Sequence, residues 1–153
     1  MARAATSLVT GSTAAAREGA IAALLAAPFD ADSASSASSA SSASSASVSG
    51  PASPASRLPA PAIPFDAVIL EGLGVAATPL ESHPGLQVMR IAPGCLCCDG
   101  NLVLRVTLNR LLRQRPRRLF IGLASSEHLD QLRSWLAAPP YDQLLALEPV
   151  VHA

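Results

Sequence analysis

The sequence contains no lysine: all eleven of its basic residues are arginine, and eleven acidic residues balance them. A formal net charge of zero argues against a nucleic acid as the main partner. A local basic run lies where a helix is expected to meet a strand, so we interpret it as solvated: Arg110, Arg113, Arg115, Arg117 and Arg118. No stretch approaches the roughly 20 apolar residues of a membrane-spanning helix, and Arg17 and Glu18 interrupt the Ala-rich start. We therefore expect neither a membrane partner nor export.

Cysteine is also scarce, and all three cysteines lie close together, at Cys95, Cys97 and Cys98. Three such near neighbours cannot form the paired framework of a small secreted domain, so they indicate a reducing, cytoplasmic compartment. Thiolates are soft ligands, and a turn permitted by Gly94 lets them contact one transition metal ion. We hypothesise a site for zinc, with cobalt and nickel as alternatives, whose open fourth position allows metal to be accepted and released.

Other interpretations of the cysteines stay open. They are small enough to be buried in a core without any ligand. Cys95 and Cys98 also have the Cys-x-x-Cys spacing of redox sites, at a turn before an expected helix where a thiolate is stabilised. The candidates for a fourth metal ligand are Glu71, His83, Asp99 and His128. The sequence does not rank them.

Strand-like and helix-like segments alternate along the chain, which predicts an α/β fold with a mainly parallel sheet flanked by helices. With only five aromatic residues, its core is expected to consist of Leu, Val and Ile. The expected strands are residues 7–11, 65–72, 86–94, 117–125 and 143–153, and the expected helices are 17–27, 101–115 and 126–138. At about residues 30–64, Ser, Ala, Gly and Pro predict a flexible insert, because this composition buries too little apolar surface to offset the entropy of ordering. We expect a single domain over residues 1–153.

The first expected strand leads into "GSTAAARE", where many nucleotide-binding folds have a phosphate-binding loop. Such a loop needs glycines for close backbone approach, a Lys that reaches the phosphates and a hydroxyl for magnesium. Gly11 fits the first glycine, but Ala16 replaces the second, Arg17 replaces the Lys and Glu18 replaces the hydroxyl residue. A carboxylate about 4 Å from a phosphate is disfavoured by roughly 4 kcal/mol. An arginine fork is a poor substitute for a compact ammonium.

Together with "GCLCC" at residues 94–98, this loop resembles the CobW/HypB/UreG family of P-loop GTPases and metallochaperones. Further similarities are "AVILEGLGVA", "RPRRLFIGLASSEHLDQL" and "VVHA", in which His152 stands for the family's Asp. The resemblance implies a P-loop NTPase-like sheet and a client metalloprotein as partner. The chain departs from the family at Gly122, where the family has Glu, and it stops before the guanine-specifying motif and the second domain.

We therefore expect a metal-binding, CobW-like protein with a degenerate nucleotide site, in which GTP and magnesium do not serve as working cofactors. Whether the chain is an enzyme stays open, because the family hydrolyses GTP. One alternative is an active GTPase that contacts its nucleotide mainly through backbone amides of the altered loop. Another is a non-functional, truncated remnant. The oligomeric state is not indicated.

Overall fold

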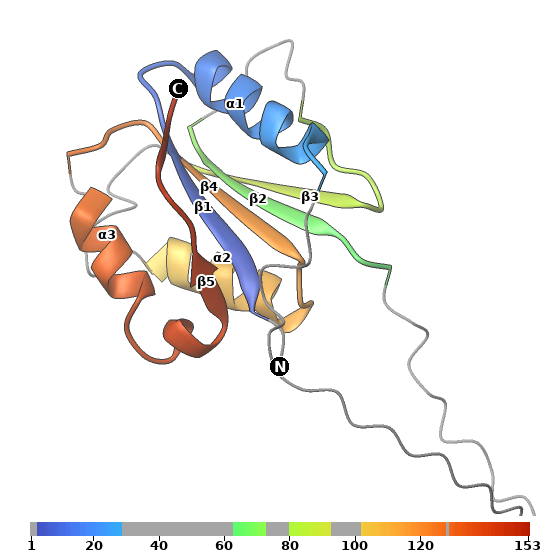
Figure 1. The fold of residues 1–153 in the computed structure, drawn as a ribbon, viewed down its shortest axis with the longest axis vertical. Helices are drawn as coiled ribbons and strands as arrows, with labels where there is room; N and C mark the ends of the chain where they lie inside the picture. The colour runs from blue at the N-terminus through green and yellow to red at the C-terminus, as the bar shows by residue number, and fades with distance from the viewer. Residues whose placement is uncertain (1–2, 29–62, 73–79, 93–101, 128) are drawn as a thin grey trace, which may run out of the picture. The chain divides into compact units, whose positions relative to one another are not determined.

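The computed structural model describes residues 3–28, 63–72, 80–92, 102–127 and 129–153. Strands and helices alternate along these ranges (Figure 1). The strands are β1 Ala4–Thr10, β2 Asp66–Glu71, β3 Leu86–Ile91, β4 Arg118–Leu123, β5 Leu145–Leu147 and β6 Val151–His152. The helices are α1 Ala14–Ala26, α2 Leu102–Arg113 and α3 Leu129–Leu136, with a 3-10 helix at Tyr141–Gln143. The predicted insert lies outside the described residues, apart from Ile63 and Pro64.

The strands form one parallel sheet in the order β3-β2-β4-β1-β5. β6 pairs with β1 as well, beside Val9 and Thr10, whereas β5 lies beside residues 4–6 of the same strand. The expected final strand is therefore two short strands along one edge of β1. They are separated at Pro149, which has no N–H to donate to a strand ladder. The mainly parallel α/β sheet predicted from the sequence is confirmed.

Helices cover both faces of this sheet (Figure 1). Successive side chains of a strand point to opposite faces, so Ala67 and Ile69 of β2 join one apolar cluster while Val68 and Leu70 join the other. The first cluster includes the buried leucines of α2 and α3: Leu104, Leu108, Leu111, Leu132 and Leu136. The second includes Ile21 of α1. Most of the buried hydrophobic side chains are aliphatic, as expected from the composition.

The first helix begins at Ala14, three residues before the start predicted from its Ala, Leu and Ile content. The reason is a capping interaction, because the Oγ1 of Thr13 accepts a hydrogen bond from the Ala16 N–H at 3.1 Å. An N-cap of this kind satisfies one of the free amides at a helix start and so stabilises the first turn.

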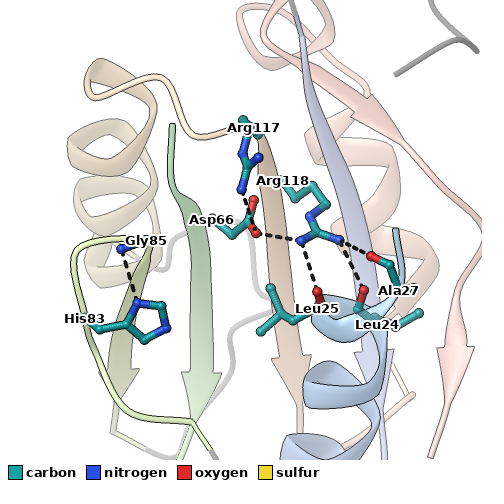
Figure 2. A network of polar contacts seen from close by, with 8 residues as sticks. All are labelled: Leu24, Leu25, Ala27, Asp66, His83, Gly85, Arg117 and Arg118. Atoms are coloured by element: carbon teal, nitrogen blue, oxygen red, sulfur yellow. Dashed lines mark hydrogen bonds and ion pairs between the residues drawn. The ribbon is translucent and has the colours of Figure 1, made fainter. Parts of the chain in front are cut away.

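A polar network joins α1 to the amino ends of β2 and β4 (Figure 2). Asp66 Oδ2 accepts hydrogen bonds from Arg118 at 2.7 Å and from Arg117 at 3.4 Å. Arg118 also donates to carbonyl oxygens at the C-terminal end of α1, those of Leu24, Leu25 and Ala27. Two arginines of the basic run, which the sequence predicted to be solvated, are thus bound to a carboxylate. Because Ala27 and Asp66 lie on either side of the insert in sequence, the Arg118 guanidinium links its two flanks.

Candidate functional site

In parallel α/β sheets, ligands bind at the edge formed by the carboxyl ends of the strands. Here β1, β2 and β4 end at Thr10, Glu71 and Leu123, and α1 begins beside the end of β1. The predicted metal ligands follow β3 in the sequence, after Ile91 and before Leu102 of α2. The cysteine triplet itself lies outside the described residues: Cys95, Cys97 and Cys98. The predicted metal site therefore stays a prediction.

The turn between β1 and α1 is short. Three residues, 11–13, separate Thr10 from Ala14, so Ala16, which stands at the position of the second loop glycine, lies inside the helix. The Ala16 N–H is bound by Thr13 Oγ1, and the Arg17 N–H donates to the Thr13 carbonyl at 3.2 Å. Two amides near the start of α1 are thus occupied by protein groups instead of being available to an anion.

The Arg17 side chain folds back from α1 and joins the ends of two strands. Its Nη1 donates to the Gly11 carbonyl at 2.6 Å, and its Nη2 donates to the Glu71 carbonyl at 3.1 Å. The residue is only 4% exposed. A Cβ on Gly11 would lie 3.1 Å from Arg17 Cγ and 3.2 Å from the Ala153 carbonyl oxygen, so this glycine makes room for protein atoms. Arg17 therefore serves as an internal brace in this structure.

Glu18 is buried to 1% exposure and pairs with Arg90 of β3, whose Nη1 lies 2.7 Å from Glu18 Oε1. The carboxylate lies beyond the first turn of α1, where the helix dipole acts weakly, and the guanidinium of Arg90 neutralises it. Removing Arg90 would leave the buried Glu18 carboxylate uncompensated, so the pair is costly to break from that side.

Gly122, one residue before the end of β4, is closely surrounded by other side chains. A Cβ on Gly122 would lie 2.7 Å from Leu70 Cδ2 and 3.5 Å from Ile21 Cδ1. The carboxylate of Glu71 lies at this edge, where its Oε2 accepts a hydrogen bond from the Ala124 N–H at 2.9 Å. The carboxyl group at the end of β2 thus bridges to the residue that follows β4.

Two candidates for a fourth metal ligand lie at opposite edges of the sheet. Glu71 ends β2 at the carboxyl edge, whereas His83 precedes β3, at the amino edge, where its Nδ1 accepts from the Gly85 N–H at 3.2 Å (Figure 2). The length of β3, about 17 Å, separates His83 from the point where the cysteine segment follows in the sequence. The other two candidates, Asp99 and His128, lie outside the described residues. Across the described ranges, no three His, Cys, Asp or Glu side chains come together as a metal site would require.

Two features of this edge were not predicted from the sequence. The cap at Thr13 has a recognisable signal, since Thr directly before an Ala-rich run is typical of a helix N-terminus. The pairing of Glu18 with Arg90 joins residues 72 positions apart and has no local signal. His152, which stands at the family's Asp position, lies beside Thr10, with 2.8 Å between Nδ1 and the threonine Oγ1.

Comparison with known proteins gives one informative match. Over 69 residues, which are 44% of this chain, the sequence is 39% identical to the zinc chaperone YeiR of Escherichia coli (strain K12). The matched stretch spans 21% of the length of that relative. No protein-family model matches the chain, and no solved structure matches it. Within the described residues, no helix is long and apolar enough to cross a membrane.

Proposed function

We propose that this chain is a CobW-like, single-domain protein that binds zinc through Cys95, Cys97 and Cys98, serves in zinc handling and does not use a nucleotide. The observation that carries the proposal is the 39% identity to a zinc chaperone over 69 residues. The name of that relative favours zinc over cobalt or nickel as the metal. Three thiolates in one short segment are ligands that suit this ion.

The arrangement around Arg17 supports the absence of a nucleotide. Phosphate binding here would require the guanidinium to leave the carbonyl oxygens of Gly11 and Glu71 and the helix start to lose its Thr13 cap. A hydrogen bond from a charged donor contributes about 1.5–3 kcal/mol, and a cap contributes about 1 kcal/mol. One residue further along α1, the buried Glu18 carboxylate pairs with Arg90 where a phosphate-binding loop needs a hydroxyl for magnesium.

Metal transfer in this proposal proceeds by exchange of ligands. Zinc binding displaces the thiol protons of the cysteines, so uptake is favoured as the pH rises. Three thiolates leave one position of a tetrahedral ion open, and a thiolate or imidazole of a client metalloprotein can enter there before the cysteines leave. This chemistry requires reduced cysteines, which is consistent with a cytoplasmic location. Glu71 is the better-placed of the two described candidates for a supporting ligand.

The test is a parallel titration of reduced protein with Zn²⁺, against a chromophoric chelator, and with a fluorescent GTP analogue. We expect one zinc ion per chain, an affinity at least about 100-fold lower when all three cysteines are replaced by serine, and no nucleotide signal. Glu71→Gln and His83→Ala form a matched pair, because each removes one candidate ligand at one edge of the sheet. The His83 variant is expected to bind zinc as the parent does.

Other outcomes would overturn the proposal in distinguishable ways. GTP binding without thiol-dependent zinc uptake would identify the altered loop as the working site of a GTPase. A Cys95–Cys98 disulfide that forms reversibly while zinc affinity stays negligible would favour a redox site. If the protein bound neither zinc nor GTP and its thermal melt were broad and non-cooperative, the chain would be a non-functional remnant.

A further inference from the structure

The first turns of α2 expose an unusual group of aliphatic side chains. Leu102 is 68% exposed, Val103 57% and Val106 59%. The described residues contain two other large hydrophobic side chains that are exposed, Ile63 and Leu144, and neither belongs to a helix or a strand. Single exposed hydrophobic residues are normal, but a group on one helix marks a surface that is covered by something else.

Exposed arginines continue the same surface toward the end of α2. The helix buries one side against the sheet through Leu104, Leu108 and Leu111. Helical spacing places Leu102, Val106 and Arg113 along the opposite side. We define the outer face of α2 by its exposed apolar and basic residues: Leu102, Val103, Arg105, Val106, Arg110 and Arg113.

The charge of this face has no counterpart on the helix. No Asp or Glu occurs in α2, and among the described residues no ion pair is made by Arg105, Arg110 or Arg113. The helix dipole favours cations in the last turn, which accounts for two of these arginines but not for Arg105 or the aliphatic group. The face therefore carries its aliphatic group, with Arg105 among it, at one end and Arg110 and Arg113 at the other.

We propose that the outer face of α2 docks an acidic, amphipathic segment of another protein. The centre of the aliphatic group lies near residue 104 and that of the terminal arginines near residue 111, so about 11 Å of helix separates them. A matching segment presents an apolar anchor and, about 11 Å further along, two or more carboxylates. Charge complementarity of this kind directs partner choice and speeds encounter.

Two other occupants fit the face less well. A two-fold contact between the outer faces of two copies would bury the arginines of both with no carboxylate of α2 to neutralise them. A single-stranded nucleic acid favours aromatic side chains on which bases stack, and α2 has none. An acidic protein segment is the occupant that uses both ends of the face.

The inference is tested on the full chain with a defined probe, a fluorescent helical peptide of about 18 residues with leucines at one end and glutamates along the same face. We expect Leu102→Gln with Val106→Gln to weaken peptide binding at least about tenfold, and Arg110→Gln with Arg113→Gln at least about fivefold. One change of each kind placed elsewhere, Arg3→Gln with Leu144→Gln, is the control and should leave the affinity unchanged. A peptide with Gln in place of Glu should bind at least about fivefold more weakly.

The substituted side chains are exposed, so thermal melts verify that each variant stays folded. Replacing the three cysteines by serine should not alter peptide affinity, which separates this inference from the proposed zinc function. No peptide binding, equal losses in the control variant or equal binding of the Gln peptide would overturn it. Self-association in light scattering that Leu102→Gln abolishes would identify a second copy as the occupant instead. Tighter binding of a single-stranded RNA of matched length would likewise overturn it.

Discussion

Replacing Arg17 with Ala is expected to destabilise the fold, because the side chain braces the carboxyl edge of the sheet. Its guanidinium donates to the carbonyl oxygens of Gly11 and Glu71 at 2.6 and 3.1 Å, and the residue is 4% exposed. Two hydrogen bonds from a charged donor contribute about 3–6 kcal/mol before desolvation is considered. Burying the charged guanidinium costs free energy, and this cost offsets part of the contribution of the two hydrogen bonds. We expect a net loss of about 2–4 kcal/mol in the free energy of unfolding.

Urea denaturation and thermal melting followed by circular dichroism measure this loss. At this chain length about 1 kcal/mol corresponds to roughly 4 °C in Tm, so the Arg17→Ala variant should melt about 8–16 °C lower than the parent. Added GTP and magnesium should not change either melting temperature, because a ligand raises Tm only if it binds the folded state.

Arg17→Lys supplies the matched variant, since it installs the lysine of a phosphate-binding loop. An ammonium lacks the fork that reaches two carbonyl oxygens together, so we expect a smaller loss of about 1–2 kcal/mol. It should not create GTP binding, because Glu18 stays buried one residue away and Ala16 stays inside α1. The reasoning would be refuted if Arg17→Ala melted at the parent's temperature while the parent bound GTP and Arg17→Ala did not. Arg17 would then be a nucleotide-binding residue.

Two further predictions concern the space around Gly122 and the insert. Gly122→Ala places a Cβ 2.7 Å from Leu70 Cδ2, so we expect it to lower the free energy of unfolding by about 1–2 kcal/mol in urea denaturation. The loss should shrink when Leu70→Ala makes room, and simple additivity of the two changes would contradict the crowding. Replacing residues 29–62 with a linker of about five residues should stabilise the fold by about 1.5 kcal/mol, since each halving of a closed loop contributes roughly 0.6 kcal/mol. Loss of the cooperative melt would show that the insert belongs to the packed domain.

The interior strands β2 and β4 were the most predictable elements, whereas β1 begins at Ala4, three residues before its predicted start. The predicted ranges 65–72 and 117–125 contain β2 and β4. These strands could be predicted because a strand buried on both faces is a continuous apolar run in the sequence. The final strand was less predictable, since a single apolar segment is divided at Pro149 into two pairings with β1. The start of α1 was placed late because helix content was judged from apolar residues, while the Thr13 cap begins the helix earlier.

The contacts of the candidate site depended on information that no local pattern carries. Arg17 reaches the Glu71 carbonyl across 54 positions of sequence, and Glu18 reaches Arg90 across 72. Both contacts depend on the strand order β3-β2-β4-β1. In this order β2 and β3 lie in the part of the sheet whose one face packs against α1. The sequence indicated that the phosphate-binding loop was altered. It did not indicate that Arg17 donates to two backbone carbonyl oxygens or that Glu18 pairs with Arg90.

The contacts of Arg17 and Glu18 with protein groups affect how zinc would be exchanged under the proposed function. A nucleotide can bias metal release only if its binding changes the protein, and in this chain the guanidinium of Arg17 and the carboxylate of Glu18 are already bound to protein groups. Release must then be driven by the client's own ligands. Transfer by ligand exchange proceeds in the direction of the tighter site, so the zinc affinity of this chain has to be lower than that of its client. It also has to be independent of GTP, unlike that of a metallochaperone whose nucleotide state controls release.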